Sequence, residues 1–213
     1  MLSDVILRPH RMDRSTSVDD RVALHPLVQA AAEGVLPDWS VAGPQRLLHM
    51  ARVAALLDSW ADGLGLPIEE RARWRAAGYL HDSLRDAPAA SLRALAGSLG
   101  DISDPLLHGP AAAQRLRTDG VADEELLAAV AFHTTGDPAF RRLGRALYAA
   151  DFLEPGRTYL GEREVELRAR APRDLDAVVL EVVRARAAYL DGRMDLHPRT
   201  KAFLGTLEAE LHG

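Results

Sequence analysis

The sequence predicts an all-α protein, and three observations support this fold class. Hydrophobic residues make up 47% of the 213 residues but aromatic residues only 5%, and the many Ala, Leu, Arg and Glu residues favour helices over sheets. Apolar side chains recur at helical spacing, most clearly between Pro44 and Leu64, which indicates a helix with one buried face. No segment shows the alternation of a half-buried strand. We therefore expect a helical bundle.

The predicted chain order is a polar arm over residues 1–23 followed by a single helical domain over residues 24–213. Pro44 at a first turn, Asp123 as an N-cap, and glycines after the apolar stretches set the expected helix ends. His25, just before Pro26, is expected to be a helix-start residue and not a ligand. The expected helices cover approximately residues 24–35, 44–63, 67–82, 88–99, 108–119, 124–132, 139–153, 175–190 and 199–211.

The composition excludes several kinds of site. The chain has no cysteine, so disulfides, thiolate metal sites and thiol nucleophiles are absent. Its formal net charge is −5, with both signs mixed along the chain, so nucleic-acid binding is not indicated. No signal peptide and no apolar run of membrane-spanning length are visible. We expect a cytoplasmic protein without nucleic-acid or membrane partners, in which any metal is bound by His and carboxylate side chains.

An adjacent His-Asp pair, His81-Asp82, closes an apolar helical stretch. Neighbouring residues on a helix point about 100° apart, so both cannot face the core, and burial alone does not explain the pair. Near a helix end, both side chains can lean toward one ion. The alternative is that His81 caps the helix C-terminus and Asp82 is solvated.

Further His and Asp residues occur in matching positions. His49, His108 and His133 also lie at predicted helix starts or ends, and Asp151 lies in the apolar stretch Tyr148–Leu153, where a buried carboxylate needs a partner or a metal. Taken singly, each residue has an ordinary explanation, as a helix or capping histidine or as an aspartate paired with an arginine. Together, imidazoles and carboxylates suit a first-row divalent metal. Six candidate ligands exceed the four of a structural zinc, so the set suggests two ions that share one carboxylate.

Five segments between residues 45 and 159 carry a resemblance to a known family. They are Arg-Leu-Leu-His at 46–49, Ala-Gly-Tyr-Leu-His-Asp at 77–82, Leu-His-Gly-Pro at 107–110, Ala-Phe-His-Thr-Thr-Gly at 131–136 and Leu-Tyr-Ala-Ala-Asp-Phe-Leu-Glu-Pro-Gly-Arg at 147–157. With them the sequence resembles the HD-domain metal-dependent phosphohydrolases, and most of all the bacterial symmetrical diadenosine tetraphosphate hydrolases, the YqeK-like group. The His-Thr-Thr-Gly and Ala-Asp-Phe-Leu-Glu-Pro-Gly-Arg segments are more specific than the His-Asp pair.

The resemblance implies an all-helical HD-domain bundle with additional C-terminal helices and a catalytic core at about residues 45–159. It assigns four residues to the set of metal ligands that the superfamily shares: His49, His81, Asp82 and Asp151. Asp82 is the implied bridge to a second ion, whose ligands would be His108 and His133. It also implies two divalent ions, iron or manganese in place of a fixed zinc, and a nucleotide or dinucleoside polyphosphate substrate. The implied reaction is symmetrical hydrolysis of diadenosine tetraphosphate to two ADP by a metal-activated water, with Asp82 and Arg85 as catalytic residues.

Substrate contacts are expected from arginines and hydroxyls in or near these segments. Arg46, Arg85 and Arg157 are candidates to hold phosphate charge, with surface solvation as the alternative in this Arg-rich chain. Thr134 and Thr135 are candidates to donate hydrogen bonds to phosphate, or to cap the preceding helix. The family usually has a Lys where Arg85 stands, and the planar, forked Arg changes the geometry of a phosphate contact.

The residues also leave other functions open. The domain could be another nucleotide phosphatase or nucleotidase, or a nucleotide-binding HD sensor with weak turnover. Hydrolysis of cyclic dinucleotides by the HD-GYP subgroup is disfavoured, because no Gly-Tyr-Pro segment occurs. The apolar faces of the expected helices 175–190 and 199–211 could pack on the core or on a second subunit, so a homodimer is also an expectation.

Overall fold

The computed structural model describes residues 23–97, 102–190 and 196–213, and these ranges are helical without any strand. The predicted all-α fold class is therefore confirmed. The predicted polar arm lies outside the described residues, apart from its last position. The helices are α1 (Pro26–Ala32), α2 (Pro44–Gly63), α3 (Ile68–Leu80), α4 (Ala89–Ala96), the 3-10 turn η1 (Asp104–Leu106), α5 (His108–Thr118), α6 (Glu124–Phe132), α7 (Arg142–Leu153), α8 (Glu162–Arg170), α9 (Leu175–Leu190) and α10 (Pro198–His212).

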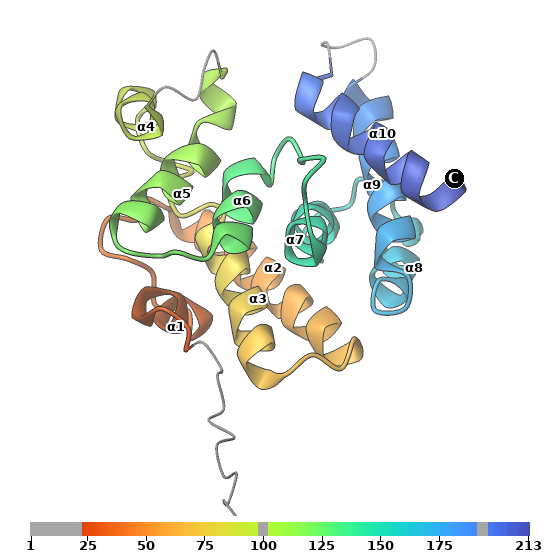
Figure 1. The fold of residues 1–213 in the computed structure, drawn as a ribbon, viewed down its shortest axis with the longest axis horizontal. Coiled ribbons are helices and arrows are strands. Elements are labelled where there is room, and N and C mark those ends of the chain that lie inside the picture. The colour runs from red at the N-terminus through yellow and green to blue at the C-terminus, as the bar shows by residue number, and fades with distance from the viewer. Residues whose placement is uncertain (1–22, 98–101, 191–195) are drawn as a thin grey trace, which may run out of the picture.

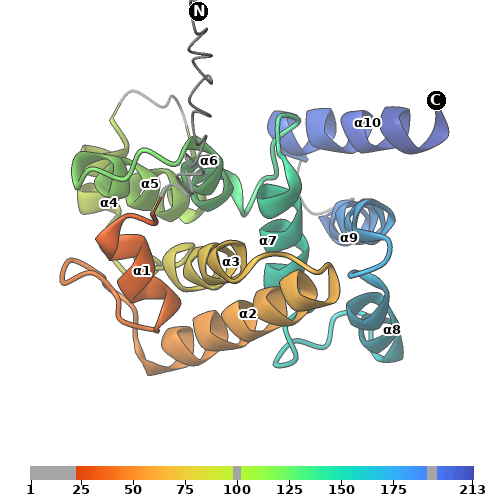
Figure 2. The same ribbon diagram turned by 60° about the horizontal axis from the view of Figure 1, so that its bottom comes forward.

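Helix α7 stands between the two halves of the bundle. Helices α1 to α6 lie on one side of it, with α2 packed on α3, α1 on α3 and α5 on α6, and helices α8 to α10 lie on the other side (Figures 1 and 2). Ten of the twelve residues of α7 are buried, as expected for a helix that is enclosed on all sides. A carboxylate on this helix, such as Asp151, is therefore taken out of water.

Local sequence signals set the ends of several helices. Pro44 is the first residue of α2, where its missing N–H costs no hydrogen bond. Asp123 caps α6 by accepting a hydrogen bond from the backbone N–H of Leu126 (3.0 Å). His25 caps α1 by accepting from the backbone N–H of Leu27 (3.2 Å), so its predicted position at a helix start is confirmed.

Two glycines allow the helices of the core to approach closely. A Cβ atom at Gly78 on α3 would lie 2.5 Å from the Cα of Ala54 on α2. A Cβ atom at Gly109 on α5 would lie 2.7 Å from the carbonyl oxygen of Ala131 on α6. Both distances are shorter than real contacts allow, so only glycine fits these positions without a shift of the helices. The close packing brings the end of α3 near α2, and the start of α5 near the end of α6.

The structure corrects several predicted helix boundaries. Helix α8 was not expected, because six of its nine residues are charged and it buries only Glu164 and Leu167; charged pairs along its surface, such as Arg170 with Glu166 (3.4 Å), support it instead. Helix α7 begins at Arg142 and not at residue 139, because Asp137 accepts from the backbone N–H of Ala139 (2.7 Å) and holds a turn. The helix predicted over 88–99 ends at residue 96, and its last two predicted positions lie outside the described residues.

The C-terminal helices pack on the same chain. The inner face of α9 is buried against α7 and α10 through Val178, Val179, Val182 and Val183. Helix α10 buries Phe203 and Leu207. These apolar faces are therefore satisfied within one chain, while the expected homodimer stays a prediction. Among the described helices, none is long and apolar enough to cross a membrane.

Candidate metal centre

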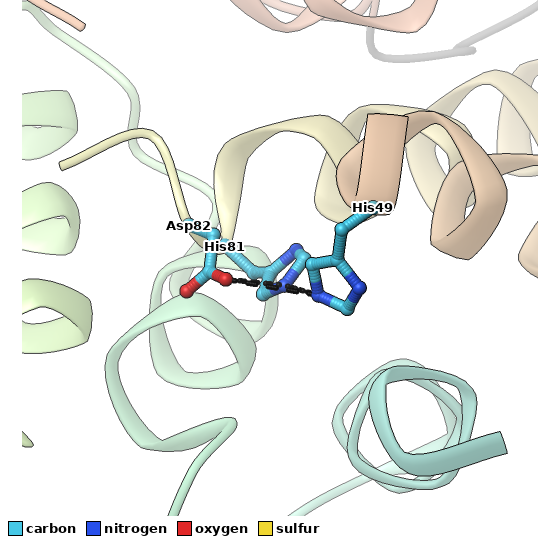
Figure 3. Close-up of side chains that lie close together, drawn as sticks. All are labelled: His49, His81 and Asp82. Atoms are coloured by element: carbon cyan, nitrogen blue, oxygen red, sulfur yellow. Dashed lines mark hydrogen bonds and ion pairs between the residues drawn. The ribbon is translucent and has the colours of Figure 1, made fainter. Parts of the chain in front are cut away.

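The six predicted metal ligands converge in the middle of the bundle. They come from α2, the end of α3, the start of α5, the end of α6 and α7, and their exposed fractions lie between 0% and 6%. Figure 3 shows how His81 and Asp82, at the end of α3, face His49 on α2. Residues more than a hundred positions apart in the sequence thus meet in one buried polar cluster: His49, His81, Asp82, His108, His133 and Asp151.

All four histidines are oriented in the same way. Each Nδ1 atom lies within hydrogen-bond distance of an oxygen that can only accept, so a hydrogen on Nδ1 satisfies each of these oxygen contacts and leaves the Nε2 lone pair free. Nη1 of Arg85 also lies 3.0 Å from Nδ1 of His108, but it donates to the carbonyl oxygen of Pro105 (2.9 Å). This is the tautomer that a metal-binding imidazole needs when Nε2 is the ligand atom. The acceptors are the carbonyl oxygens of Gly78 for His81 (2.8 Å), Val130 for His133 (2.8 Å) and Pro105 for His108 (3.0 Å), and the carboxylate of Glu154 for His49 (3.1 Å).

The Nε2 atoms face one another in two pairs. Nε2 of His49 lies 3.3 Å from Nε2 of His81, and Nε2 of His108 lies 3.1 Å from Nε2 of His133. In this tautomer the paired lone pairs repel, and a cation between them would relieve the repulsion. Two nitrogens at about 2.1 Å from one ion are about 3.0 Å apart at a right angle and about 3.4 Å apart at the tetrahedral angle. The observed spacings therefore fit shared coordination.

Asp82 lies between the two histidine pairs. Its Oδ1 atom is 3.1 Å from Nε2 of His108 and 3.5 Å from Nε2 of His133. Its Oδ2 atom is 3.4 Å from Nε2 of His81 and 3.7 Å from Nε2 of His49. The two oxygens of one carboxylate thus face different pairs. The donor atoms form two groups that could each hold an ion, and Asp82 belongs to both.

Asp151 adds a second carboxylate to the group of His49 and His81. Its Oδ1 atom lies 3.1 Å from Nε2 of His49 and 3.8 Å from Nε2 of His81. Burial alone would raise the pKa of Asp151, but the close contact with His49 and the charge of Arg157 hold this pKa well below its usual range. Burial would also raise the pKa of Asp82, but the effects of His81, His108 and His133 are larger and hold this pKa well below its usual range. Both carboxylates are therefore ionised at neutral pH.

Burial in this cluster keeps His108 neutral. Desolvation lowers the pKa of His108 to about 4, against the opposing effect of the neighbouring Asp82 carboxylate. A neutral imidazole is the form that binds a metal. Neutral imidazoles and ionised carboxylates, without any thiolate, suit divalent first-row metals, so the donor set fits the ions implied by the sequence.

The predicted arginines reach this centre to different extents. Nη1 of Arg46 lies 2.7 Å from Oδ2 of Asp82, and Nη1 of Arg157 lies 2.7 Å from the carbonyl oxygen and 3.1 Å from Oδ1 of Asp151. Simple surface solvation does not describe these two residues. Arg85 is farther out, because its Nη1 atom donates to the carbonyl oxygen of Pro105 (2.9 Å) and lies 3.0 Å from Nδ1 of His108.

The two predicted threonines differ in position. Oγ1 of Thr134 lies 3.1 Å from Nε2 of His133, so this hydroxyl is at the edge of the centre. The hydroxyl of Thr135 is buried and donates to the carbonyl oxygen of Gly136 (3.1 Å), in the turn that follows α6. The structure therefore brings Thr134 to the centre and leaves the hydroxyl of Thr135 in the turn.

Sequence reasoning missed three residues at the centre: Glu154, its partner Arg52, and Arg186. Glu154, which is 1% exposed, holds Nδ1 of His49 and accepts from Nε of Arg52 (2.5 Å). It lies within the Leu147–Arg157 segment, but its contact with His49 was not expected. Burial would raise the pKa of Glu154, but the hydrogen bonds of Arg52 and the backbone lower it to about 2.

Arg186 on α9 is the third missed residue. It donates from Nη2 to the carbonyl oxygen of Thr134 (3.1 Å), and its Nη1 atom lies 3.9 Å from Oδ2 of Asp151. No local motif marks this residue, because it is one of two arginines on an amphipathic helix. Its role at the centre depends on the packing of α9 against α7.

Comparison with known proteins places this geometry in a family. The HD domain family model matches residues 46–180. The chain belongs to the HD domain family. That stretch contains all six residues of the centre, and HD domains bind divalent metals. The predicted resemblance is therefore confirmed.

Three curated relatives of this HD protein have the same description, symmetrical bis(5'-nucleosyl)-tetraphosphatase. The relative from Halalkalibacterium halodurans is 35% identical over 109 residues, which cover 50% of this chain and 57% of the relative. The relative from Staphylococcus aureus is 27% identical over 150 residues, or 67% and 74% of the two chains. The relative from Bacillus subtilis is 33% identical over 91 residues, or 42% and 48%. The chain thus spans only about half the length of two of these relatives.

A solved structure has the same fold. It is described as a predicted HD superfamily hydrolase involved in NAD metabolism, from Clostridium acetobutylicum. The match has a TM-score of 0.69 at 28% identity and covers 86% of this chain and 96% of the other. The likeness therefore extends beyond residues 46–180 to most of the bundle.

Proposed function

We propose that the protein is a metal-dependent phosphohydrolase that cleaves a phosphoanhydride bond of a nucleotide. The favoured reaction is symmetrical hydrolysis of diadenosine tetraphosphate to two molecules of ADP. One observation carries this proposal: two groups of buried donor atoms share Asp82, which is the arrangement of sites that bind two ions side by side. The descriptions of three relatives support the choice of substrate.

The proposed ions are divalent, two in number, and either iron or manganese. The donors for the first are His49, His81, Asp82 and Asp151, and those for the second are His108, His133 and Asp82. When bound, the ions would lower the pKa of a water molecule and withdraw charge from phosphoryl oxygens. The chain's part is to keep the four imidazoles in one tautomer through their Nδ1 contacts.

The arginines are proposed to hold the polyphosphate. Arg46 and Arg157 are paired with the carboxylates of Asp82 and Asp151. Because bound ions would take over the charge of these carboxylates, both guanidinium groups would be available for phosphate oxygens, to which Arg can bind in a bidentate way. Charge that develops on a transferred phosphoryl group is stabilised by such preorganised donors. Arg85 is proposed to contact phosphate from the side of His108.

The charge of the centre favours a polyphosphate over a monophosphate. Five guanidinium groups and three carboxylates lie around the donor atoms: Arg46, Arg52, Arg85, Arg157, Arg186, Asp82, Asp151 and Glu154. The arginines already exceed the carboxylates, and two divalent ions would add further positive charge. A substrate with several ionised phosphates matches this excess, whereas a mononucleotide neutralises less of it.

A nucleotide panel tests the function. The protein, loaded with Mn²⁺ or Fe²⁺, is incubated with diadenosine tetraphosphate, ATP, ADP and AMP, and the products are separated by chromatography. We expect ADP as the sole nucleotide product from diadenosine tetraphosphate. Equal release of ATP and AMP would contradict symmetrical cleavage, and preferred hydrolysis of AMP would indicate a nucleotidase.

The Asp82→Asn variant is the control for the role of the shared carboxylate. We expect it to keep the helical circular-dichroism spectrum but to lose metal binding and hydrolysis, because one oxygen of each group becomes a weak neutral ligand or a donor. Full activity of this variant with bound metal would remove Asp82 from the proposed mechanism.

A further inference from the structure

A cavity of about 210 Å³ is lined by the residues on either side of His133 in the sequence. It lies between η1, the start of α5, the end of α6 and the start of α10. Its wall includes Leu106, Pro110, Phe132, Thr134, His197 and Arg199. We call it the Phe132 cavity.

The Phe132 cavity is one residue away from a metal-ligand candidate. Phe132 and Thr134 line it, and His133 lies between them in the sequence. Successive Cα atoms are 3.8 Å apart, and successive helical side chains point about 100° apart. The ring of Phe132 can therefore face the cavity while the ring of His133 faces the donor cluster. Thr134 connects the two spaces, because its hydroxyl lies 3.1 Å from Nε2 of His133.

The wall of the Phe132 cavity offers stacking surfaces. The guanidinium of Arg199 lies 4.0 Å from the centre of the Phe132 ring, and Arg199 is held there by an ion pair with Asp137. Planar aromatic and guanidinium groups are the surfaces on which nucleobases stack in proteins. Leu106 and Pro110 add apolar surface to the wall.

His197 adds a hydrogen-bond donor to this wall. Its Nδ1 atom accepts from the backbone N–H of Arg199 (3.2 Å), so the ring hydrogen of the neutral imidazole is on Nε2. Ring nitrogens of a purine are acceptors that such a donor can pair with. A cavity with apolar walls, a stacking surface and a few polar groups has the usual composition of a small-molecule site.

We propose that the Phe132 cavity binds the base of the nucleoside whose phosphates lie at the ion of His108 and His133. This inference rests on the proposed function and adds a base subsite to it. The volume of the cavity is below the roughly 300–1,000 Å³ of pockets that enclose a drug-sized ligand, so it takes one purine and not a whole dinucleotide. The second nucleoside of diadenosine tetraphosphate lies outside this cavity.

An exposed aromatic side chain beside Arg157, the partner of Asp151, provides a competing position. Tyr159 is 55% exposed, stacks on Phe152 with ring centres 5.0 Å apart, and lies 5.8 Å from the guanidinium of Arg157. No cavity encloses its ring among those described here. Tyr159 is therefore the matched control, as an aromatic residue beside an arginine of the same centre.

The test compares ligands with and without a base. Calorimetry measures the affinities of ADP and of inorganic pyrophosphate for the Mn²⁺-loaded protein and for Phe132→Leu, Arg199→Lys and Tyr159→Leu. Phe132→Leu keeps an apolar side chain, and Arg199→Lys keeps the charge beside Asp137 but loses the planar group. We expect the first two variants to weaken ADP binding by roughly 5- to 150-fold, the range for loss of one base stack. Their pyrophosphate affinity, and both affinities of Tyr159→Leu, should stay within about twofold of wild type.

Any other result of this calorimetric test contradicts the proposed base subsite. Equal losses for ADP and pyrophosphate would mean that the substitutions disturb the metal centre itself. Unchanged ADP affinity in both cavity variants, or a selective loss in Tyr159→Leu, would place the base elsewhere. Because binding needs no turnover, these results are separate from the proposed function: a wild-type protein that hydrolyses no nucleotide refutes the function, while its ADP and pyrophosphate affinities still decide the subsite.

Discussion

Replacing Glu154 with Gln should weaken metal binding although Glu154 is not itself a proposed ligand. The carboxylate accepts hydrogen bonds from Nδ1 of His49 (3.1 Å), from Arg52 (2.5 and 3.1 Å) and from the backbone N–H of Gly156 (2.6 Å). Gln offers one oxygen and one NH₂ group in place of two acceptor oxygens. Whichever way the amide turns, its NH₂ group faces an N–H of His49 or of Arg52 and Gly156.

The size of the effect follows from these contacts. A donor left unpaired in a buried site costs about 1–3 kcal/mol, and Glu154 is 1% exposed. Where the lost contact is the one to Nδ1 of His49, the ring is no longer held in the tautomer and orientation that point Nε2 at the centre. Substitution of such a supporting residue typically costs roughly 10- to 100-fold in metal affinity. We therefore expect a tenfold or larger rise in the Mn²⁺ dissociation constant of Glu154→Gln.

The assay is Mn²⁺ titration by calorimetry, in competition with a chelator, and it requires no substrate. Glu164→Gln is the matched control, because Glu164 is also 1% exposed but accepts from the backbone N–H of Leu160 (2.9 Å) and lies 3.7 Å from Arg168, away from the centre. It should lower the unfolding temperature and leave the Mn²⁺ affinity unchanged. Wild-type affinity in Glu154→Gln, or the same loss in both variants, would refute the reasoning.

Three further predictions concern the stability of the bundle. Removal of metal with a chelator should lower the unfolding temperature, and added Mn²⁺ should raise it again. At a hundredfold excess of Mn²⁺ over the dissociation constant, the free energy of unfolding should rise by about 2.7 kcal/mol. No change on either step would contradict a metal-dependent core. Gly78→Ala should destabilise the protein by about 1–3 kcal/mol in chemical denaturation, because its Cβ would lie 2.5 Å from the Cα of Ala54. Gly205→Ala, which meets nothing within 4 Å, should instead stabilise it by up to about 1 kcal/mol, and equal effects would refute the close packing of α2 and α3. Nη2 of Arg73 lies 2.8 Å from Asp123 and lowers the pKa of that half-buried carboxyl against the effect of desolvation. The contribution of this ion pair is present above the unfolded pKa of about 3.9 and is lost as the pH falls through the lower folded value. The stability difference between wild type and Asp123→Asn should thus be about 1–3 kcal/mol at neutral pH and disappear in acid, and a difference independent of pH would contradict the ion pair.

Helix positions could be predicted wherever one residue decides the local backbone. Pro44 and Asp123 mark the starts of α2 and α6 because a missing N–H and a capping carboxylate act within one turn. Helix α8 could not be predicted in this way. Its sequence lacks an apolar stripe, and it depends on charged pairs and on the burial of Leu167 against the rest of the chain.

The candidate ligands could be predicted because their chemistry is visible in the residue type. A histidine or aspartate at the end of an apolar helix has an ordinary explanation by itself, but all six of them lie within segments of recognisable pattern. The residue type of a supporting residue does not mark it in this way. Glu154 and Arg186 are ordinary charged residues in the sequence, and only the folding of the chain around α7 brings them to His49 and Asp151.

The central claim is that one carboxylate joins two ion sites, and anomalous X-ray scattering from crystals soaked in Mn²⁺ tests it most directly. The account predicts two peaks roughly 3.5–4 Å apart, one beside each oxygen of Asp82, with His49 and His81 at one peak and His108 and His133 at the other. A single peak, or peaks that do not touch Asp82, would contradict it.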